Sequence, residues 1–84
     1  MQADQHIQYW LESADRSWST AKDLLKTEHY DACLFFCHLA LEKLLKALVV
    51  KVTQEPAPYL HDLAKLGQIA KLELTNEQIQ QLRT

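Results

Sequence analysis

The chain has 84 residues, a net charge of −2 at pH 7 and 48% hydrophobic residues, a composition that excludes an intrinsically disordered protein. The length fits one domain, and a domain this small buries only roughly 60–65% of its unfolded surface, so dimerisation would enlarge its core. The slightly acidic balance gives no electrostatic reason for tight nucleic-acid binding over the whole surface. One glycine and two prolines predict long helices joined by short connections.

Residues 4–26 form the first predicted helix. Apolar side chains recur along it by four and three, as in a coiled-coil seam, at Ile7, Leu11, Ala14, Trp18, Ala21 and Leu25. Trp10 widens this stripe, and we interpret both tryptophans as core anchors because aromatic side chains bury large areas. The polar residues 1–8 lack the apolar run of a signal peptide, which predicts a cytoplasmic protein.

Residues 30–52 form the second predicted helix, which is apolar on nearly every side. Between residues 32 and 50 the only polar side chains are His38, Glu42, Lys43 and Lys46. His38, Glu42 and Lys46 step by four, so they share one narrow stripe of the helix. We therefore expect neighbours to cover this helix on most sides, as a central core element or at a subunit contact.

The short link 27–29 predicts that these two helices form an antiparallel hairpin. Cys33 and Cys37 are interpreted as reduced structural thiols. A metal site that adds His29 is the alternative, but a helical Cys-x3-Cys pair is not a usual zinc spacing. We expect no metal ion and no cofactor.

The remaining residues predict a loop and two further helices. Residues 54–59 contain both prolines and form the loop, and residues 60–72 favour a third helix with Asp62 in its first turn. Thr75 and Gln78 fit a capping box that opens a fourth helix. Because the sequence stops about two turns later, we expect residues 1–84 to be a single domain truncated at its C-terminus. No apolar run is long enough to span a membrane.

Four segments together resemble the HEPN domain family (higher eukaryote and prokaryote nucleotide-binding domain). In chain order they are AKDLLK, HYDAC, HLALEKLLKAL and YLHDLAKL. The third has the spacing Ala-x-Glu-Lys-x-x-Lys-Ala, and the fourth is similar to the family's Thr-His-Asp-Leu segment, with Leu60 where threonine is common. The resemblance covers residues 9–82.

This resemblance implies an all-α fold, an up-and-down antiparallel bundle of four or five helices in which the long first two form a hairpin. It also implies a homodimer and a minimal nucleotidyltransferase protein as partner, in a toxin–antitoxin-type system. Nuclease members of the family carry an arginine followed four to six residues later by a histidine. No histidine follows Arg16 at this spacing, and only Thr84 follows Arg83.

Six residues are candidates for contact with a nucleotide or RNA: His38, Glu42, Lys43, Lys46, His61 and Asp62. The stripe of His38, Glu42 and Lys46 suits a ligand pocket, but a surface ion pair from Glu42 to Lys46 is the simpler interpretation. Adjacent residues on a helix diverge by ~100°, so we expect Asp62 to cap the third helix while His61 packs on the second. A basic face that would suit RNA or a nucleotide phosphate is weighed against ordinary solvated lysines; its members would be Lys43, Lys46, Lys51, Lys65 and Lys71.

The sequence therefore predicts a nucleotide- or RNA-associated module and leaves open whether it is an enzyme. Two alternatives remain at this point. One is a metal-independent ribonuclease toxin whose Arg/His motif lies beyond residue 84. The other is a structural dimerisation module without a ligand.

Overall fold

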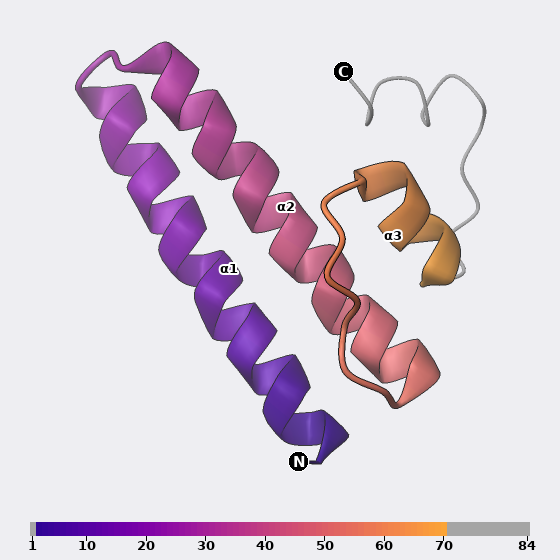
Figure 1. Cartoon of the computed structure of the whole chain (residues 1–84). Helices are drawn as coiled ribbons and strands as arrows, with labels where there is room; N and C mark the ends of the chain where they lie inside the picture. Colours follow the sequence, from indigo (N-terminus) through magenta and orange to yellow (C-terminus); the bar gives the residue numbers. More distant parts are fainter. Residues whose placement is uncertain (1, 71–84) are drawn as a thin grey trace.

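A computed structural model describes residues 2–70, which form helices and connecting segments with no strand among them. The helices are α1 (Ala3–Lys26), α2 (Tyr30–Thr53) and α3 (Leu63–Ile69). Figure 1 shows α1 and α2 side by side as a long hairpin, with the short α3 beside α2 on the side away from α1. The predicted all-α class and the hairpin are confirmed. The predicted fourth helix lies outside the described residues.

The hairpin turn and the end of α2 both use left-handed backbone. In the link 27–29, Glu28 has φ 62°, and the Thr27 hydroxyl donates to the carbonyls of Asp23 and Leu24, each at 3.2 Å. Gln54 ends α2 with φ 59°, and its backbone N–H donates to the Val50 carbonyl at 2.7 Å. Such a residue stops a helix because it satisfies a free carbonyl while turning the chain.

The third helix is shorter than predicted and begins at Leu63 instead of Leu60. The Asp62 carboxylate accepts a hydrogen bond from the backbone N–H of Lys65 at 3.1 Å, so Asp62 is the N-cap. Residues before an N-cap lie outside the helix, which explains why Leu60 and His61 are in the connecting segment. The expectation that Asp62 caps this helix is confirmed.

Small side chains of α1 pack against α2. The buried residues of α1 are Ser13, Ala14, Ser17 and Ala21, which allow the two helices to approach closely. Three residues of the predicted seam, Leu11, Trp18 and Leu25, are about half exposed instead. The interpretation of Trp18 as a core anchor is therefore wrong within residues 2–70.

A compact apolar cluster joins α2 to α3. It consists of Leu45 and Val49 from α2 with Leu63, Leu66 and Ala70, and Leu60 and Ile69 pack at its edge. This cluster holds α3 and the segment 54–62 against α2, and so determines where the side chains of that segment lie.

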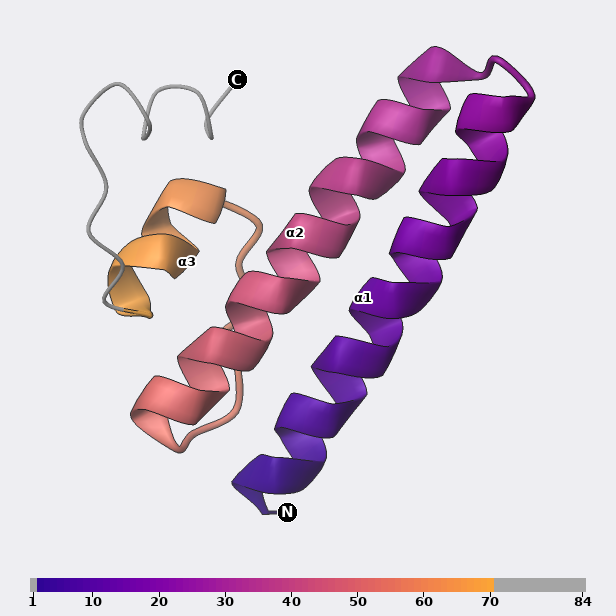
Figure 2. The same ribbon diagram turned by 180° about the vertical axis from the view of Figure 1, so that it is seen from behind.

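One side of α2 remains uncovered. Leu34, Leu41, Leu44 and Leu48 are exposed, and Figure 2 shows the hairpin from the side opposite segment 54–62, where no other described element lies over it. These four leucines and Leu11, Trp18 and Leu25 of α1 are called the open face below. Within residues 2–70, α1, α3 and segment 54–62 cover the other sides of α2, so the expectation that neighbours cover this helix on most sides is met except along the open face.

Candidate functional site

The centre of the candidate site is a buried ion pair on α2. The Glu42 carboxylate and the Lys46 ammonium, one turn apart, are separated by 3.3 Å, and each side chain is only 6% exposed. The Trp10 ring of α1 covers the ammonium, with Nζ 5.0 Å from the ring centroid. The predicted pairing is present, but the interpretation as a surface ion pair is wrong because α1 and segment 54–62 cover it.

His61 contacts the same carboxylate from the other side. Its Nδ1 lies 3.0 Å from both carboxylate oxygens of Glu42, and its side chain is 64% exposed. The expectation that His61 packs on the second helix is confirmed. A carboxylate only accepts, so Nδ1–H donates, and Nε2 makes no hydrogen bond within residues 2–70.

An aromatic ring extends this site into solvent. Tyr59 is 96% exposed, and its ring packs edge to face with His61, with centroids 5.4 Å apart. Tyr59 therefore presents a flat apolar ring beside the polar imidazole of His61, and both lie over the buried carboxylate of Glu42. This combination can stack on a base or sugar and hydrogen-bond to it.

Three of the predicted site residues lie elsewhere. Asp62 caps α3, and His38 is exposed one turn before Glu42. Lys43 crosses to α1, where its ammonium donates to the Ser17 hydroxyl at 2.8 Å and to the Ser13 carbonyl at 3.5 Å. The predicted stripe is thus divided. Of the predicted basic face, Lys43 and Lys46 direct their ammonium groups to contacts with other residues, Lys51 and Lys65 are exposed, and Lys71 lies outside the described residues.

The Lys43 ammonium lies in an electropositive environment. Burial lowers the pKa of Lys43 below its usual value, and the positive charges of Arg16 and Lys46 lower it further, while the Glu42 carboxylate partly opposes them. Around the Lys43 ammonium, the Glu42 carboxylate therefore stands against the positive charges of Arg16 and Lys46.

The profile of the HEPN domain family matches residues 7–84. The chain belongs to the HEPN domain family. No curated protein and no solved structure matches it. The family assignment predicted from the four sequence segments is confirmed.

Three further features of this HEPN domain concern metal ligands, the two cysteines and the apolarity of the helices. Within residues 2–70 no group of three His, Cys, Asp or Glu side chains is arranged to hold a metal ion. Cys33 and Cys37 are free thiols. The pKa of Cys33 is raised, chiefly because the thiol is desolvated by burial and next because Cys37 is close to it. None of the three described helices combines the length and apolarity needed to cross a bilayer.

Sequence reasoning missed Trp10 and Tyr59 as parts of the HEPN site. Trp10 was expected only in the helix seam and Tyr59 only in a loop. The residue pattern carries no signal for either contact, because the packing of α1 on α2 brings Trp10 to Lys46 and the path of residues 54–62 brings Tyr59 to His61. A tyrosine two residues before the histidine of the YLHDLAKL segment is the single hint that the sequence offers.

Proposed function

We propose that this HEPN domain is a nucleotide- or RNA-associated module that acts beside a minimal nucleotidyltransferase in a toxin–antitoxin-type system. The observation that carries the ligand part of the proposal is the Glu42–His61 contact, with Nδ1 3.0 Å from the carboxylate. It lies in a chain that matches the HEPN family over residues 7–84. The nucleotidyltransferase part rests on the family resemblance alone.

The arrangement suits binding better than cleavage. Metal-free RNA cleavage needs a base near the 2′-hydroxyl and a cation that stabilises the charged phosphorane. His61 can serve as a hydrogen-bonding group, but Lys46, the cation that shares its carboxylate partner, is buried beneath Trp10 and paired with Glu42. A nucleobase stacked on Tyr59 with an edge toward Nε2 of His61 requires no such cation.

A homodimer through the open face is the second part of the proposal. A groove of about 430 Å³ runs along this face and is lined by Leu11, Ala14, Asp15, Trp18, Ala40 and Leu44. Its seven large side chains are about half exposed, and a fully exposed one carries on the order of 200 Å². The face thus offers roughly 700 Å², close to the ~800 Å² that each partner buries in a standard interface.

The spacing on α1 suits a two-fold arrangement. Leu11, Trp18 and Leu25 are seven residues apart, so an antiparallel copy centred on Trp18 places Leu11 against Leu25 of the partner subunit. The same register brings Asp15 beside Lys22 of the partner subunit. Opposite charges there would favour this pairing over a shifted one.

The open face also favours one competing function, a structural dimerisation module without a ligand. Binding of AMP, ATP and a hexauridylate to the full chain, measured by calorimetry and by amide shifts in NMR spectra, separates the two. We expect binding that Tyr59→Ala and His61→Gln weaken, whereas His6→Gln, a histidine substitution on α1, leaves it unchanged. No binding by any probe would favour the structural module.

The partner and the reaction need separate tests. Co-expression with a minimal nucleotidyltransferase encoded beside this gene should give a complex that co-elutes, and failure to co-elute contradicts the partner assignment. Incubation of the full chain with RNA in EDTA should leave the RNA intact. Cleavage under these conditions would favour the ribonuclease alternative instead.

A further inference from the structure

Lys43 holds its ammonium in a fixed position between the two long helices. The group donates to the Ser17 hydroxyl at 2.8 Å and to the Ser13 carbonyl at 3.5 Å. Ser17 is itself buried, so these acceptors are part of the helix contact. An ammonium has three N–H groups, and two such contacts leave one available for an outside acceptor.

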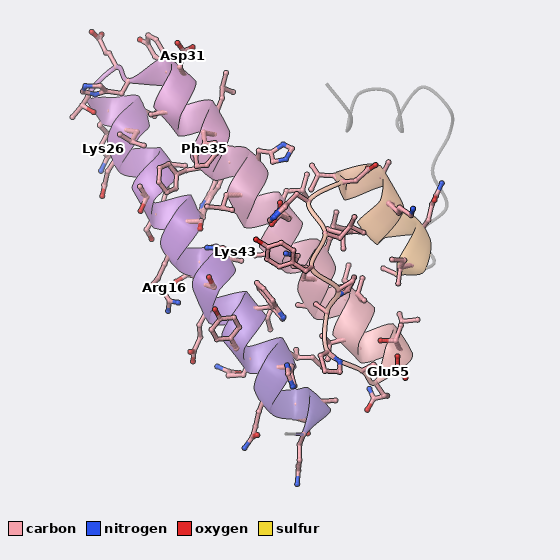
Figure 3. The ribbon with its side chains drawn as sticks, viewed as in Figure 1. Arg16, Lys26, Asp31, Phe35, Lys43 and Glu55 are labelled. Atoms are coloured by element: carbon pink, nitrogen blue, oxygen red, sulfur yellow. The ribbon has the colours of Figure 1, made fainter. Side chains whose placement is uncertain are left out.

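Arg16 is the second cation at this position. It precedes Ser17 on α1, its side chain is exposed, and no ion pair of its guanidinium occurs within residues 2–70. Its charge is close enough to Lys43 to lower the pKa of that lysine, next in effect after burial. Figure 3 shows Phe35, Lys43 and Arg16 in this order along one face of the hairpin.

The carboxylate that acts on Lys43, that of Glu42, is already engaged. Glu42 contacts Lys46 at 3.3 Å and His61 at 3.0 Å, and it only partly offsets the positive charge around Lys43. Arg16 and Lys43 therefore form a local excess of positive charge, and the Lys43 ammonium is partly desolvated. An anion placed between them would relieve their repulsion and use their free N–H groups.

Aromatic pairs lie on both sides of these cations along the hairpin. Tyr9 and Trp10 pack edge to face at 5.0 Å, and Phe35 and Phe36 do so at 5.4 Å. Tyr9 is seven residues before Arg16, and two turns of a helix return to the same side. Tyr9 and Phe35 are both more than half exposed, so their rings are available for stacking.

We infer that Arg16 and Lys43 form a phosphate-binding site at the α1–α2 contact, for the phosphate group of a free nucleotide or of single-stranded RNA. The planar guanidinium of Arg16 donates hydrogen bonds to two phosphate oxygens, and the ammonium of Lys43 supplies a second positive charge. Tyr9 or Phe35 then stacks on an adjoining base. The ligand class rests on the proposed function, but the site is separate from the Glu42–His61 contact.

Binding of three probes to the full chain tests the site: inorganic phosphate, AMP and a hexauridylate. Arg16→Gln should weaken binding of the probes by about tenfold and lower the salt dependence of hexauridylate binding by about one phosphate contact. Lys22→Gln and Lys51→Gln make the same charge change at exposed positions of α1 and α2 and should have little effect. Arg16 is exposed, so its substitution leaves the fold intact, which circular dichroism verifies.

The three probes also identify the source of the phosphate. If AMP binds more tightly than the hexauridylate, the ligand of the site is a free nucleotide. If the hexauridylate binds more tightly, the ligand is an RNA strand. A shift of the Lys43 side-chain NMR signal on adding phosphate should occur in the wild type and be lost in Arg16→Gln.

Two results would overturn the inference in different ways. If the wild type binds AMP or the hexauridylate and Arg16→Gln binds as well as Lys22→Gln, the site is wrong while the proposed function stands. If the wild type binds none of the probes, the ligand part of the proposed function fails with it.

Discussion

Glu42 and His61 are 19 residues apart in the chain, yet Nδ1 of His61 lies 3.0 Å from both carboxylate oxygens of Glu42. The same carboxylate holds the buried ammonium of Lys46 at 3.3 Å. Glu42 therefore links α2 to the segment that leads into α3, and among residues 2–70 it is the carboxylate that pairs with both basic groups. Its charge matters for stability as well as for the position of His61.

Glu42→Gln should strongly destabilise the domain. The substitution keeps the shape of the side chain but leaves the Lys46 ammonium buried without a counter-charge. Breaking a buried pair in this way costs roughly 3–5 kcal/mol. Urea unfolding followed by circular dichroism measures the change in the free energy of unfolding.

A double variant provides the control for this substitution. Glu42→Leu with Lys46→Met replaces both charges by apolar groups of similar size, and such replacements are often neutral. We expect it to recover most of the stability lost in Glu42→Gln, while His61 loses its partner. A cost below ~0.5 kcal/mol for Glu42→Gln alone would contradict the structural role of the pair.

Asp62→Ala should loosen α3. It removes the carboxylate that accepts from the Lys65 N–H at 3.1 Å, and losing an N-cap costs about 1 kcal/mol. Faster hydrogen exchange should appear in α3 and not in α1 (Ala3–Lys26). Asp62→Asn, which can still cap the helix, is the matched control, and equal exchange rates in both variants would argue against the capping role.

Substitutions in the open face should convert a dimer into a monomer. Leu44→Glu places a charge at the centre of the proposed interface, whereas Tyr59→Lys changes an exposed ring on the opposite side of α2. Sedimentation equilibrium should show a monomer for the first and a dimer for the second. A monomeric wild type would refute the homodimer directly.

Charge reversal tests the register of that dimer. Asp15→Lys should weaken association because it would lie beside Lys22 of the partner subunit, and adding Lys22→Asp should restore it. If the interface uses another register, combining Asp15→Lys with Lys22→Asp will not restore the association that either substitution alone weakens.

Lys43 should titrate below the usual lysine pKa of 10.5, chiefly because of burial and then because of Arg16. A folded pKa lower than the unfolded one means that the unfolded chain binds more protons between the two values. The free energy of unfolding contributed by Lys43 therefore rises with pH through that window and is lowest below it.

The side-chain carbon signal of Lys43 measures this titration by NMR. Its midpoint should lie below that of the exposed Lys51, and Arg16→Gln should raise it because one nearby positive charge is removed. An unchanged midpoint in Arg16→Gln would show that the two cations do not interact.

The sequence by itself determined the helices, because periodicity, turns and caps act over a few residues. It predicted the two long helices to within one or two residues and the role of Asp62 as an N-cap. The family assignment could be predicted too, since the segment around Glu42 and the segment around His61 keep recognisable spacings. His61 against the second helix was also predicted, but the reason given for it, the divergence of adjacent helical residues, does not apply because His61 precedes α3.

Only the tertiary structure decided which polar side chains are buried and which apolar ones are open. Glu42 and Lys46 look like a surface pair in the sequence, and burial makes them the centre of the site. Trp18 looks like a core residue, yet it is half exposed because Ser13, Ser17 and Ala21 bring α2 against a different side of α1. Contacts between residues far apart in the chain depend on how helices pack, and no local pattern encodes that geometry.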